Sequence, residues 1–436
     1  MKADARSGLL TGKLKKFKVE SSLASSIFNM TNMIIGAGVL ALPYAFRAAG
    51  LLPALCVCVA VWLASSYSFM LLARCAEALQ QFSYKHVAVE TYGAFAATFS
   101  EGAIMIYTIG NMIGRQIILG DLLPPLVQIF LGVDSLLAQR WFVMASITLF
   151  VLIPVSLSPY IDSLKWSSLF GLMCMCYVVV MFIAYFCRGM ATSTIAMEET
   201  RLANPSLLGL MAFPLLVVSF TAHYNTMDMY WELKRRSIPR MQTVVRSSTG
   251  ICLAVYVIVG TTGYLLFMDD TQPNILVNFW VDRSQPPNMF VATAFAAISL
   301  AVSFSFPLVC HGARNSVKKL FFASRFQKIE DGGVAENIGH IAITVAIVLL
   351  SLFVGLCVPD IGVVFAFMGS TVGVCFVYIL PALFFIKVVE ISRAHTLEVD
   401  LKQHVSTAGA TALVCFGVFI GLVGTLATSL HVARVI

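Results

Sequence analysis

The sequence is poor in charged residues. Only 12% of its 436 residues are Asp, Glu, Lys or Arg, whereas 59% are hydrophobic, and the mean hydropathy is +0.87. A soluble globular chain is close to half apolar and a quarter charged. A soluble fold of this size could not bury so much apolar surface. The composition therefore excludes a soluble protein and predicts that lipid is the solvent for most of the chain.

Motifs of catalysis and of metal binding are also missing. The eleven cysteines form no CxxC pair and lie within or at the edge of apolar segments, so neither a disulfide framework nor a cysteine metal site is expected. The sequence has no nucleophile elbow and no phosphate loop, so an enzyme is not expected. The net charge is +7, but the basic residues are not interleaved with aromatics in a soluble stretch, which argues against nucleic-acid binding.

The sequence has instead a series of apolar segments, eleven of which are long enough to cross a bilayer. They run over residues 24–46, 51–73, 97–120, 141–158, 166–187, 206–230, 242–267, 288–310, 338–358, 361–386 and 407–431. Backbone groups in lipid must bond within their own segment, and the short alternating strands of a barrel are not visible. The predicted fold class is an all-α membrane protein with eleven transmembrane helices.

Eleven segments allow an internal repeat of five. Residues 24–187 hold segments 1–5 and residues 206–386 hold segments 6–10, while residues 1–23 form an N-terminal tail and residues 407–431 an eleventh helix. An odd number of crossings makes the two units opposite in orientation. We therefore expect inverted repeats, in which segments 1 and 6 correspond.

The loops predict how the chain is oriented. With a cytoplasmic N-terminus, 22 of the 29 Lys and Arg residues fall on the cytoplasmic side, 6 fall on the outer side and Arg115 lies within a span. Cytoplasmic loops of membrane proteins carry such an excess of basic residues. We expect a cytoplasmic N-terminus and an extracellular or lumenal C-terminus, in the plasma membrane or in a vacuole or lysosome.

The first segment contains an interruption at mid-depth. Gly36-Ala37-Gly38 lies between the polar pair Thr31-Asn32 and Pro43. Glycine is the costliest ordinary residue in a helix, so the pair indicates an unwound turn. The free amides of such a turn form an anion site for a carboxylate. Alternatively, the glycines only let helices pack closely.

The sixth segment is interrupted by a polar cluster, Thr221 to Thr226. Strongly polar residues at this depth usually face a cavity and mark a transport pathway. An interhelical hydrogen bond of His223 is the alternative.

Together these segments resemble the amino acid/auxin permease family, especially its sodium-coupled neutral amino acid transporters and the vacuolar amino acid transporters. Residues 222–225, Ala-His-Tyr-Asn, followed by Tyr-Trp-Glu-Leu at 230–233, are similar to the family's sixth-helix motif. Gly-Tyr-Leu-Leu-Phe at 263–267, and Phe-Pro at 306–307 with Arg314, are further matches. The resemblance covers essentially the whole chain beyond the N-terminal tail.

The resemblance implies a LeuT-type fold of 5+5 inverted repeats plus one helix. It also implies a secondary transporter that moves an amino acid by alternating access, coupled to Na⁺ or H⁺. Backbone amides at residues 36–38 would bind the substrate carboxylate, and carbonyls near Phe220 and Thr221 would receive its ammonium. Helices 3 and 8 would wall the site. The residues assigned to substrate binding are Gly36, Ala37, Gly38, Asn111, Arg115, Phe220, Thr221 and His223.

The family also implies a cation site. Asn32 matches an asparagine that helps to coordinate Na⁺ in sodium-coupled members, and a hydroxyl of helix 8 shares the ion, which here points to Ser303 or Ser305. Oxygen ligands suit a hard cation. The two serines are two residues apart and cannot both face one site, and either one can instead bond to its own helix backbone. If protons drive transport, His223 is the candidate, because histidine titrates near neutral pH.

Arg115 is the largest departure from the family, whose members usually have tyrosine there. It lies about 14 residues, or about 20 Å, along the helix from Glu101, past mid-depth. An arginine in this position needs an anionic partner or a wet cavity. It could bind an acidic substrate side chain, replace the coupling cation, or take part in a structural pairing.

Other functions stay open at this stage. The chain could be an amino-acid-sensing membrane receptor with little transport, or a Na⁺-independent exchanger. A channel is disfavoured, because no ring of pore-lining charges is visible. The expected partners are an amino acid and the lipid bilayer, with the chain as a monomer and no cofactor other than Na⁺ or H⁺ as coupling ion.

Overall fold

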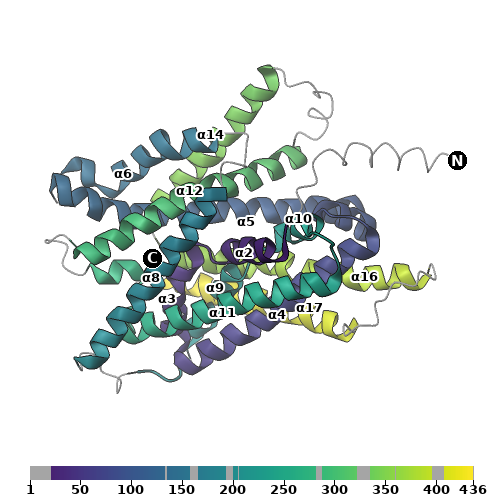
Figure 1. Ribbon diagram of the computed structural model, residues 1–436, viewed down its shortest axis with the longest axis horizontal. Coiled ribbons are helices and arrows are strands. Elements are labelled where there is room, and N and C mark those ends of the chain that lie inside the picture. The colour runs from purple at the N-terminus through teal and green to yellow at the C-terminus, as the bar shows by residue number, and fades with distance from the viewer. Residues whose placement is uncertain are drawn as a thin grey trace.

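The computed structural model describes residues 21–132, 135–157, 165–192, 200–204, 206–280, 287–321, 334–358, 360–394 and 407–435. These residues form helices and turns, with one isolated bridge between Ser21 and Leu233 and no sheet. Most of the long helices run along the long axis of the molecule (Figure 1). The α-helices are α2 (Leu23–Ile34), α3 (Leu42–Ala49), α4 (Leu51–Leu79), α5 (Tyr84–Leu131), α6 (Arg140–Ile147), α7 (Ile153–Ser156), α8 (Lys165–Ala191), α9 (Ala212–Ser219), α10 (Thr226–Glu232), α11 (Ile238–Phe267), α12 (Met289–Phe321), α14 (Val334–Cys357), α15 (Ile361–Met368), α16 (Leu380–Ala394) and α17 (Thr407–Val435).

Among the described residues, eight helices are long and apolar enough to cross a membrane, and the bent pair Leu23–Ile34 and Gly38–Ala49 together makes a ninth. The eight are Leu51–Leu79, Tyr84–Leu131, Leu169–Ala191, Ile238–Asp270, Met289–Phe321, Gly339–Cys357, Cys375–Arg393 and Thr407–Ala433. The segments predicted at 141–158 and 206–230 are built from shorter helices. The structure thus shows a helical protein with many spans, and the number eleven stays a prediction.

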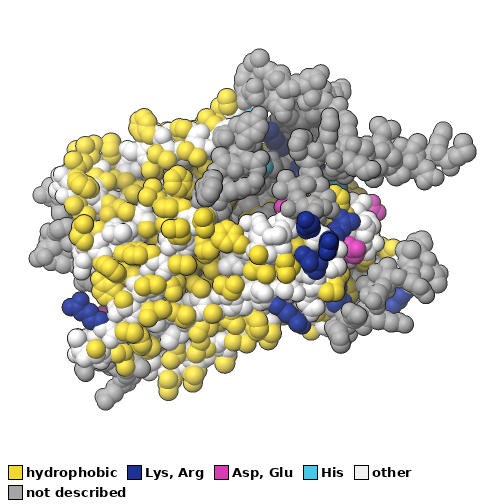
Figure 2. Space-filling model, viewed as in Figure 1, with side chains coloured by type: hydrophobic (Ala, Val, Ile, Leu, Met, Phe, Trp, Pro, Cys, Tyr) yellow, Lys and Arg dark blue, Asp and Glu magenta, His cyan; other side chains and the backbone are white. Residues whose placement is uncertain are grey.

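The outer surface carries large apolar side chains that only a bilayer would cover. Phe95, Phe130, Phe150 and Leu422 are 83%, 84%, 78% and 70% exposed. Hydrophobic side chains spread over the middle of the face drawn in Figure 2, while Lys and Arg gather mainly at the end where α10 lies. In water, apolar patches of this extent would drive association. They are the expected surface of a protein that is solvated by lipid.

The helices that are broken lie in the middle of the bundle. α9 packs against α3, α4 and α15, and α11 packs against α2, α3 and α4. α5 and α12 pack against each other along much of their length. In Figure 1 they pass on one side of α2 and α9, and α4 and α11 pass on the other. The ends of the short helices therefore meet in the interior.

Two glycines on α5 fix the direction in which its polar residues point. A Cβ added to Gly110 would lie 2.4 Å from the Met368 sulfur, and one added to Gly114 would lie 2.4 Å from the Phe365 ring, so both glycines press against α15. Neighbouring residues on a helix are about 100° apart around its axis. Asn111 and Arg115 follow these glycines, so they turn away from α15, towards α12.

Candidate functional site

The first helix is interrupted at the predicted glycines. α2 ends at Ile34, Gly36 is extended with φ −102° and ψ −164°, and a 3-10 helix begins at Ala37. The two halves, Leu23–Ile34 and Gly38–Ala49, meet at an angle of 48°. The Gly36 N–H donates to the Ile34 carbonyl at 2.8 Å, so this amide is used locally. The first amides of a helix have no carbonyl partner inside it, and the following turn therefore keeps the character of an anion site.

Gly38 is also the point where the two broken helices touch. A Cβ at Gly38 would lie 3.2 Å from the Ser219 Oγ and 3.5 Å from its Cα, whereas a Cβ at Gly36 would meet only the Ile34 carbonyl oxygen, at 4.0 Å. The chain is both unwound and closely packed here. The unwound turn and the close helix packing, which the sequence offered as alternatives, therefore occur at the same place.

The sixth helix is interrupted beside this contact. α9 ends at Ser219, residues 220–222 are not helical, and the chain resumes helical form as a 3-10 turn at 223–225 and then α10. The carbonyl end of α9 thus lies next to the amino end of the helix that follows Gly36. A helix carries partial negative charge at its carbonyl end and partial positive charge at its amino end. Such a pair of ends suits a zwitterion.

Tyr256 of α11 joins the two interruptions. Its hydroxyl lies 2.8 Å from the Ile34 carbonyl oxygen and 2.6 Å from the Ser219 carbonyl oxygen, and its side chain is fully buried. Both carbonyls belong to the last residue of a half-helix, where partners inside the helix run out. Nothing in the apolar sequence around Tyr256 distinguishes it from a tyrosine that faces lipid, so this residue could not be predicted.

Opposite the interruptions, three successive turns of α5 present polar side chains. The Tyr107 hydroxyl donates to the Val218 carbonyl at 3.4 Å. The Arg115 guanidinium, 9% exposed, donates from Nε to the Asn111 Oδ1 at 3.0 Å and from Nη1 to the Ser305 Oγ of α12 at 2.5 Å. The structure therefore brings together Asn111, Arg115 and Ser305, all of which the sequence had singled out.

Two tyrosines complete this polar cluster and were missed from the sequence. The rings of Tyr107 and Tyr224 lie 6.2 Å apart, and both phenols lie near the Arg115 guanidinium. Tyr107, Asn111 and Arg115 are spaced by four residues, and this spacing places them on one helix face. This spacing in the sequence could have identified Tyr107 as part of the cluster.

No hydrogen bond within the described part of the chain joins the residues predicted for a cation, Asn32, Ser303 and Ser305, to one another. The Ser305 hydroxyl also donates to the carbonyls of Ala301 at 2.8 Å and Val302 at 3.1 Å. Ser305 is thus bonded to its own helix backbone, which was the alternative to a cation site. Asn32 and Ser303 are half-buried, and neither is hydrogen-bonded to the described residues through its side chain. No group of three or more His, Cys, Asp or Glu that could hold a metal ion occurs in the described part of the chain.

His223 points away from this cluster. Its ring stacks on Phe69 of α4, with centroids 3.7 Å apart and planes 9° apart, and it is fully buried. The Ser65 backbone is near, but neither ring nitrogen makes a hydrogen bond of acceptable geometry to the described residues. The polar run 221–226 is thus divided between two faces, with Tyr224 towards α5 and His223 towards α4.

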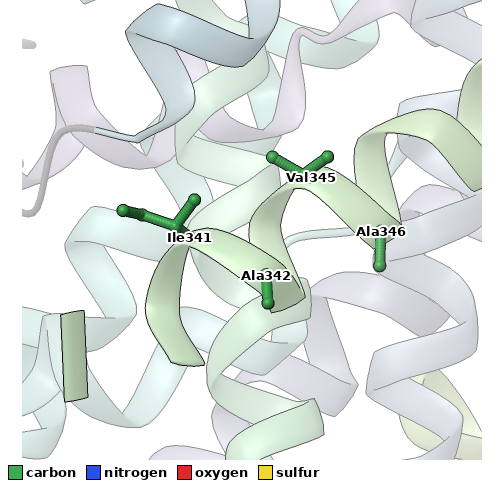
Figure 3. A pocket seen from close by; sticks show the side chains of 4 residues that line it. All are labelled: Ile341, Ala342, Val345 and Ala346. Atoms are coloured by element: carbon green, nitrogen blue, oxygen red, sulfur yellow. The ribbon is translucent and has the colours of Figure 1, made fainter. Parts of the chain in front are cut away.

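A hollow on α14 is the pocket that Figure 3 shows. Ile341, Ala342, Val345 and Ala346 line it, and all four side chains are apolar. It offers no group that could recognise an amino acid, so it is not the candidate site.

The fold is similar to that of a solved transporter, Mhp1. Over 96% of this chain and 92% of the other, the fold matches Mhp1 in its inward-facing conformation, with a TM-score of 0.61 and 10% identity. A closed conformation of Mhp1, a transporter of the nucleobase-cation-symport-1 family, with bromovinylhydantoin bound, matches with a TM-score of 0.59 and 11% identity. This match covers 95% of this chain and 91% of the other. The protein therefore has the fold of a membrane transporter.

Sequence relatives narrow the class. Residues 20–430 match the family described as transmembrane amino acid transporter protein, and the chain belongs to that family. It is 28% identical over 419 residues to sodium-coupled neutral amino acid transporter 7 of Xenopus laevis, covering 94% of this chain and 89% of the other. It is 32% identical over 370 residues to vacuolar amino acid transporter 5 of Schizosaccharomyces pombe, covering 82% of each. The protein is a multi-pass membrane protein of a transporter family, not an enzyme.

Proposed function

We propose that this protein is a secondary active transporter that moves an amino acid across a membrane by alternating access. The observation that carries the proposal is the pairing of two interrupted helices at Gly38 and Ser219, with the polar face of α5 opposite them. Half-helix ends at the middle of a bundle bind charged substrate groups in other transporters of broken-helix design. Family membership supports the same conclusion.

The substrate backbone is proposed to bind between the two interruptions. Its carboxylate accepts hydrogen bonds from amides at residues 36–38, Gly38 foremost, because Gly36 already donates to Ile34. Its ammonium group donates to carbonyls near Phe220 and Thr221, where α9 has ended. Asn111 and Arg115 face the remainder of the substrate. His223 supports this wall of the site from behind, against α4, instead of contacting the substrate.

The coupling ion is proposed to be Na⁺ or H⁺. For Na⁺, Asn32 and Ser303 are the better pair, because Ser305 already accepts a hydrogen bond from Arg115. For H⁺, His223 is the candidate, because it is a titratable imidazole within the interruption of the sixth helix. A Na⁺-independent exchanger would need neither.

The proposed setting is a single chain in the plasma membrane or in a vacuolar or lysosomal membrane, with the N-terminus in the cytoplasm. The loop charges support this orientation. The name of one relative, vacuolar amino acid transporter 5, supports the vacuolar membrane.

Uptake into proteoliposomes tests the proposal. The purified protein is reconstituted, labelled acidic, neutral and basic amino acids are offered, and Na⁺ and pH gradients are imposed separately. We expect concentrative uptake of at least one amino acid, driven by one of the gradients. Saturable binding without uptake under any gradient would instead indicate a receptor that senses amino acids.

A further inference from the structure

We infer that Arg115 makes this transporter select amino acids whose side chain carries a carboxylate and reject those with a cationic side chain. The inference rests on the proposed function. It concerns the part of the substrate beyond the carboxylate and ammonium groups that all amino acids share.

Arginine keeps its proton in proteins, so Arg115 places a permanent positive charge in the interior. Its side chain is 9% exposed, and it forms no ion pair with an acidic residue of the described chain. The ionisable side chains near it are the phenols of Tyr224 and Tyr107, and a protonated phenol carries no charge. A buried positive charge without a counter-charge is costly, and an anionic ligand would remove that cost.

Acidic residues of the neighbouring helices are engaged elsewhere. Asp121, the acid nearest on α5, pairs with Arg140 at 3.3 Å and accepts from Asn274 at 3.1 Å. Asp228 of α10 has Lys319, Glu232 and Glu101 as its charged neighbours. Glu101 is about 14 residues along α5 from Arg115, or about 20 Å. Asp228, Glu232 and Glu101 therefore lie towards the far end of α5 and do not neutralise Arg115.

The Arg115 guanidinium is held in place by hydrogen bonds that use only some of its N–H donors. Asn111 accepts from Nε and Ser305 accepts from Nη1, while Nη2 makes no hydrogen bond with the described residues. A guanidinium has five N–H donors in a planar fork that matches the two oxygens of a carboxylate. Two neutral partners thus fix the fork, and donors remain for a ligand.

The spacing suits a short dicarboxylic amino acid. Tyr107 touches the Val218 carbonyl, next to Ser219, and so marks the level of the two interruptions on α5. Asn111, which holds the guanidinium, lies one helical turn further, about 6 Å along the axis. A substrate with its backbone carboxylate at Gly38 and its second carboxylate at Arg115 would span that distance.

Competition in the wild-type protein gives the first test. Uptake of a labelled neutral amino acid into proteoliposomes is measured with unlabelled glutamate, aspartate, glutamine or lysine added. We expect glutamate or aspartate to inhibit at concentrations about tenfold or more below those needed for glutamine, because hydrogen bonds to charged groups are the stronger class. Lysine should not inhibit. Neutral uptake that glutamate and aspartate do not inhibit would overturn the inference and leave amino acid transport standing. Uptake of no amino acid of any class would contradict the proposed function itself.

Arg115→Gln and Arg115→Lys give the second test. Arg115→Gln should raise the KM for glutamate about tenfold or more and leave the KM for glutamine within about twofold, and Arg115→Lys should fall between. Arg201→Gln is the matched control, because Arg201 is 54% exposed in an ion pair with Asp269 and should change neither value. An equal loss for glutamate, glutamine and leucine would mean that Arg115 binds the shared carboxylate or is structural, and would overturn the inference.

Discussion

The hydroxyl of Tyr256 lies 2.6 Å from the carbonyl oxygen of Ser219, and the same hydroxyl lies 2.8 Å from the carbonyl oxygen of Ile34. A tyrosine hydroxyl has one proton to donate, so the two carbonyls share it. Earlier turns of α11 are bonded to α2 in the same way, Ser248 to the Ile27 carbonyl at 3.1 Å. Hydrogen bonds from Ser248 and Tyr256 thus join α11 to α2, and the Tyr256 hydroxyl also joins it to the end of α9.

Tyr256→Phe should slow transport more than it reduces the amount of folded protein. The ring stays in place against Phe220, 4.9 Å away, but two half-helix ends lose their shared donor. Each lost hydrogen bond is worth about 1 kcal/mol, so we expect a several-fold lower uptake rate at saturating substrate. Initial rates normalised to the reconstituted protein measure this. Tyr264→Phe on the same helix is the control, since its hydroxyl accepts from the Arg201 amide and, among the described residues, makes no hydrogen bond to either interruption. Equal rates in the two variants would mean that the shared donor has no part in transport.

Substitution of the two glycines of helix 1 should have unequal effects. The φ of Gly36, −102°, is open to any residue, and nothing but the Ile34 carbonyl lies within 4.0 Å of an added Cβ. Gly38→Val would force a branched side chain against Ser219. We expect Gly38→Val to abolish substrate binding and Gly36→Val to reduce it only several-fold, measured by binding to the purified protein.

A second-site change sharpens the glycine prediction. Gly38→Ala should weaken binding, and adding Ser219→Ala should restore most of it, because the Oγ is the closest atom, at 3.2 Å. No restoration in the double variant would show that the amide geometry at residue 38, and not the contact with Ser219, decides binding.

Sodium coupling makes a separate prediction. If Asn32 and Ser303 hold Na⁺, Asn32→Ala and Ser303→Ala should raise the Na⁺ concentration for half-maximal uptake several-fold. Ser305→Ala should instead change glutamate affinity, because Ser305 contacts Arg115. Uptake titrated with Na⁺ at constant ionic strength separates these effects. Full uptake from a pH gradient in Na⁺-free buffer would rule out the sodium version.

Proton coupling would make His223 essential for accumulation. His223→Gln should then abolish uptake driven by a pH gradient while leaving exchange of labelled for unlabelled amino acid, because the ring lies against Phe69 of α4 and away from Arg115. His86, an exposed histidine at the start of α5, provides the control variant His86→Gln. Loss of exchange as well as accumulation in His223→Gln would assign the residue to the structure of the site.

Much of the fold follows from sequence, because lipid imposes a simple pattern. Long apolar runs predicted the long helices, and the paired glycines and the polar run at 221–226 predicted the two interruptions. The number of spans was harder to settle, because the segments at 141–158 and 206–230 form short helices that length alone does not identify as spans.

The candidate site could be predicted only in part. Asn111, Arg115 and Ser305 were identifiable as polar residues in apolar helices, but their mutual hydrogen bonds depend on how α5 packs on α12. Whether Ser303 or Ser305 faces the two interruptions depends on how α12 is rotated about its axis, which the sequence does not give. Tyr256 was not identifiable, because a tyrosine in an apolar helix looks the same whether it faces lipid or a helix end.

Counterflow is the measurement that tests the central claim most directly. Proteoliposomes are loaded with unlabelled amino acid and diluted into a trace of the labelled one, without any ion gradient. An alternating-access transporter exposes one site to each side in turn, so we expect labelled amino acid to rise transiently above its equilibrium level inside. Gly38→Val should abolish that rise. A protein that binds the labelled amino acid but shows no rise above equilibrium, in liposomes sealed and correctly loaded, would contradict the claim that it is a transporter.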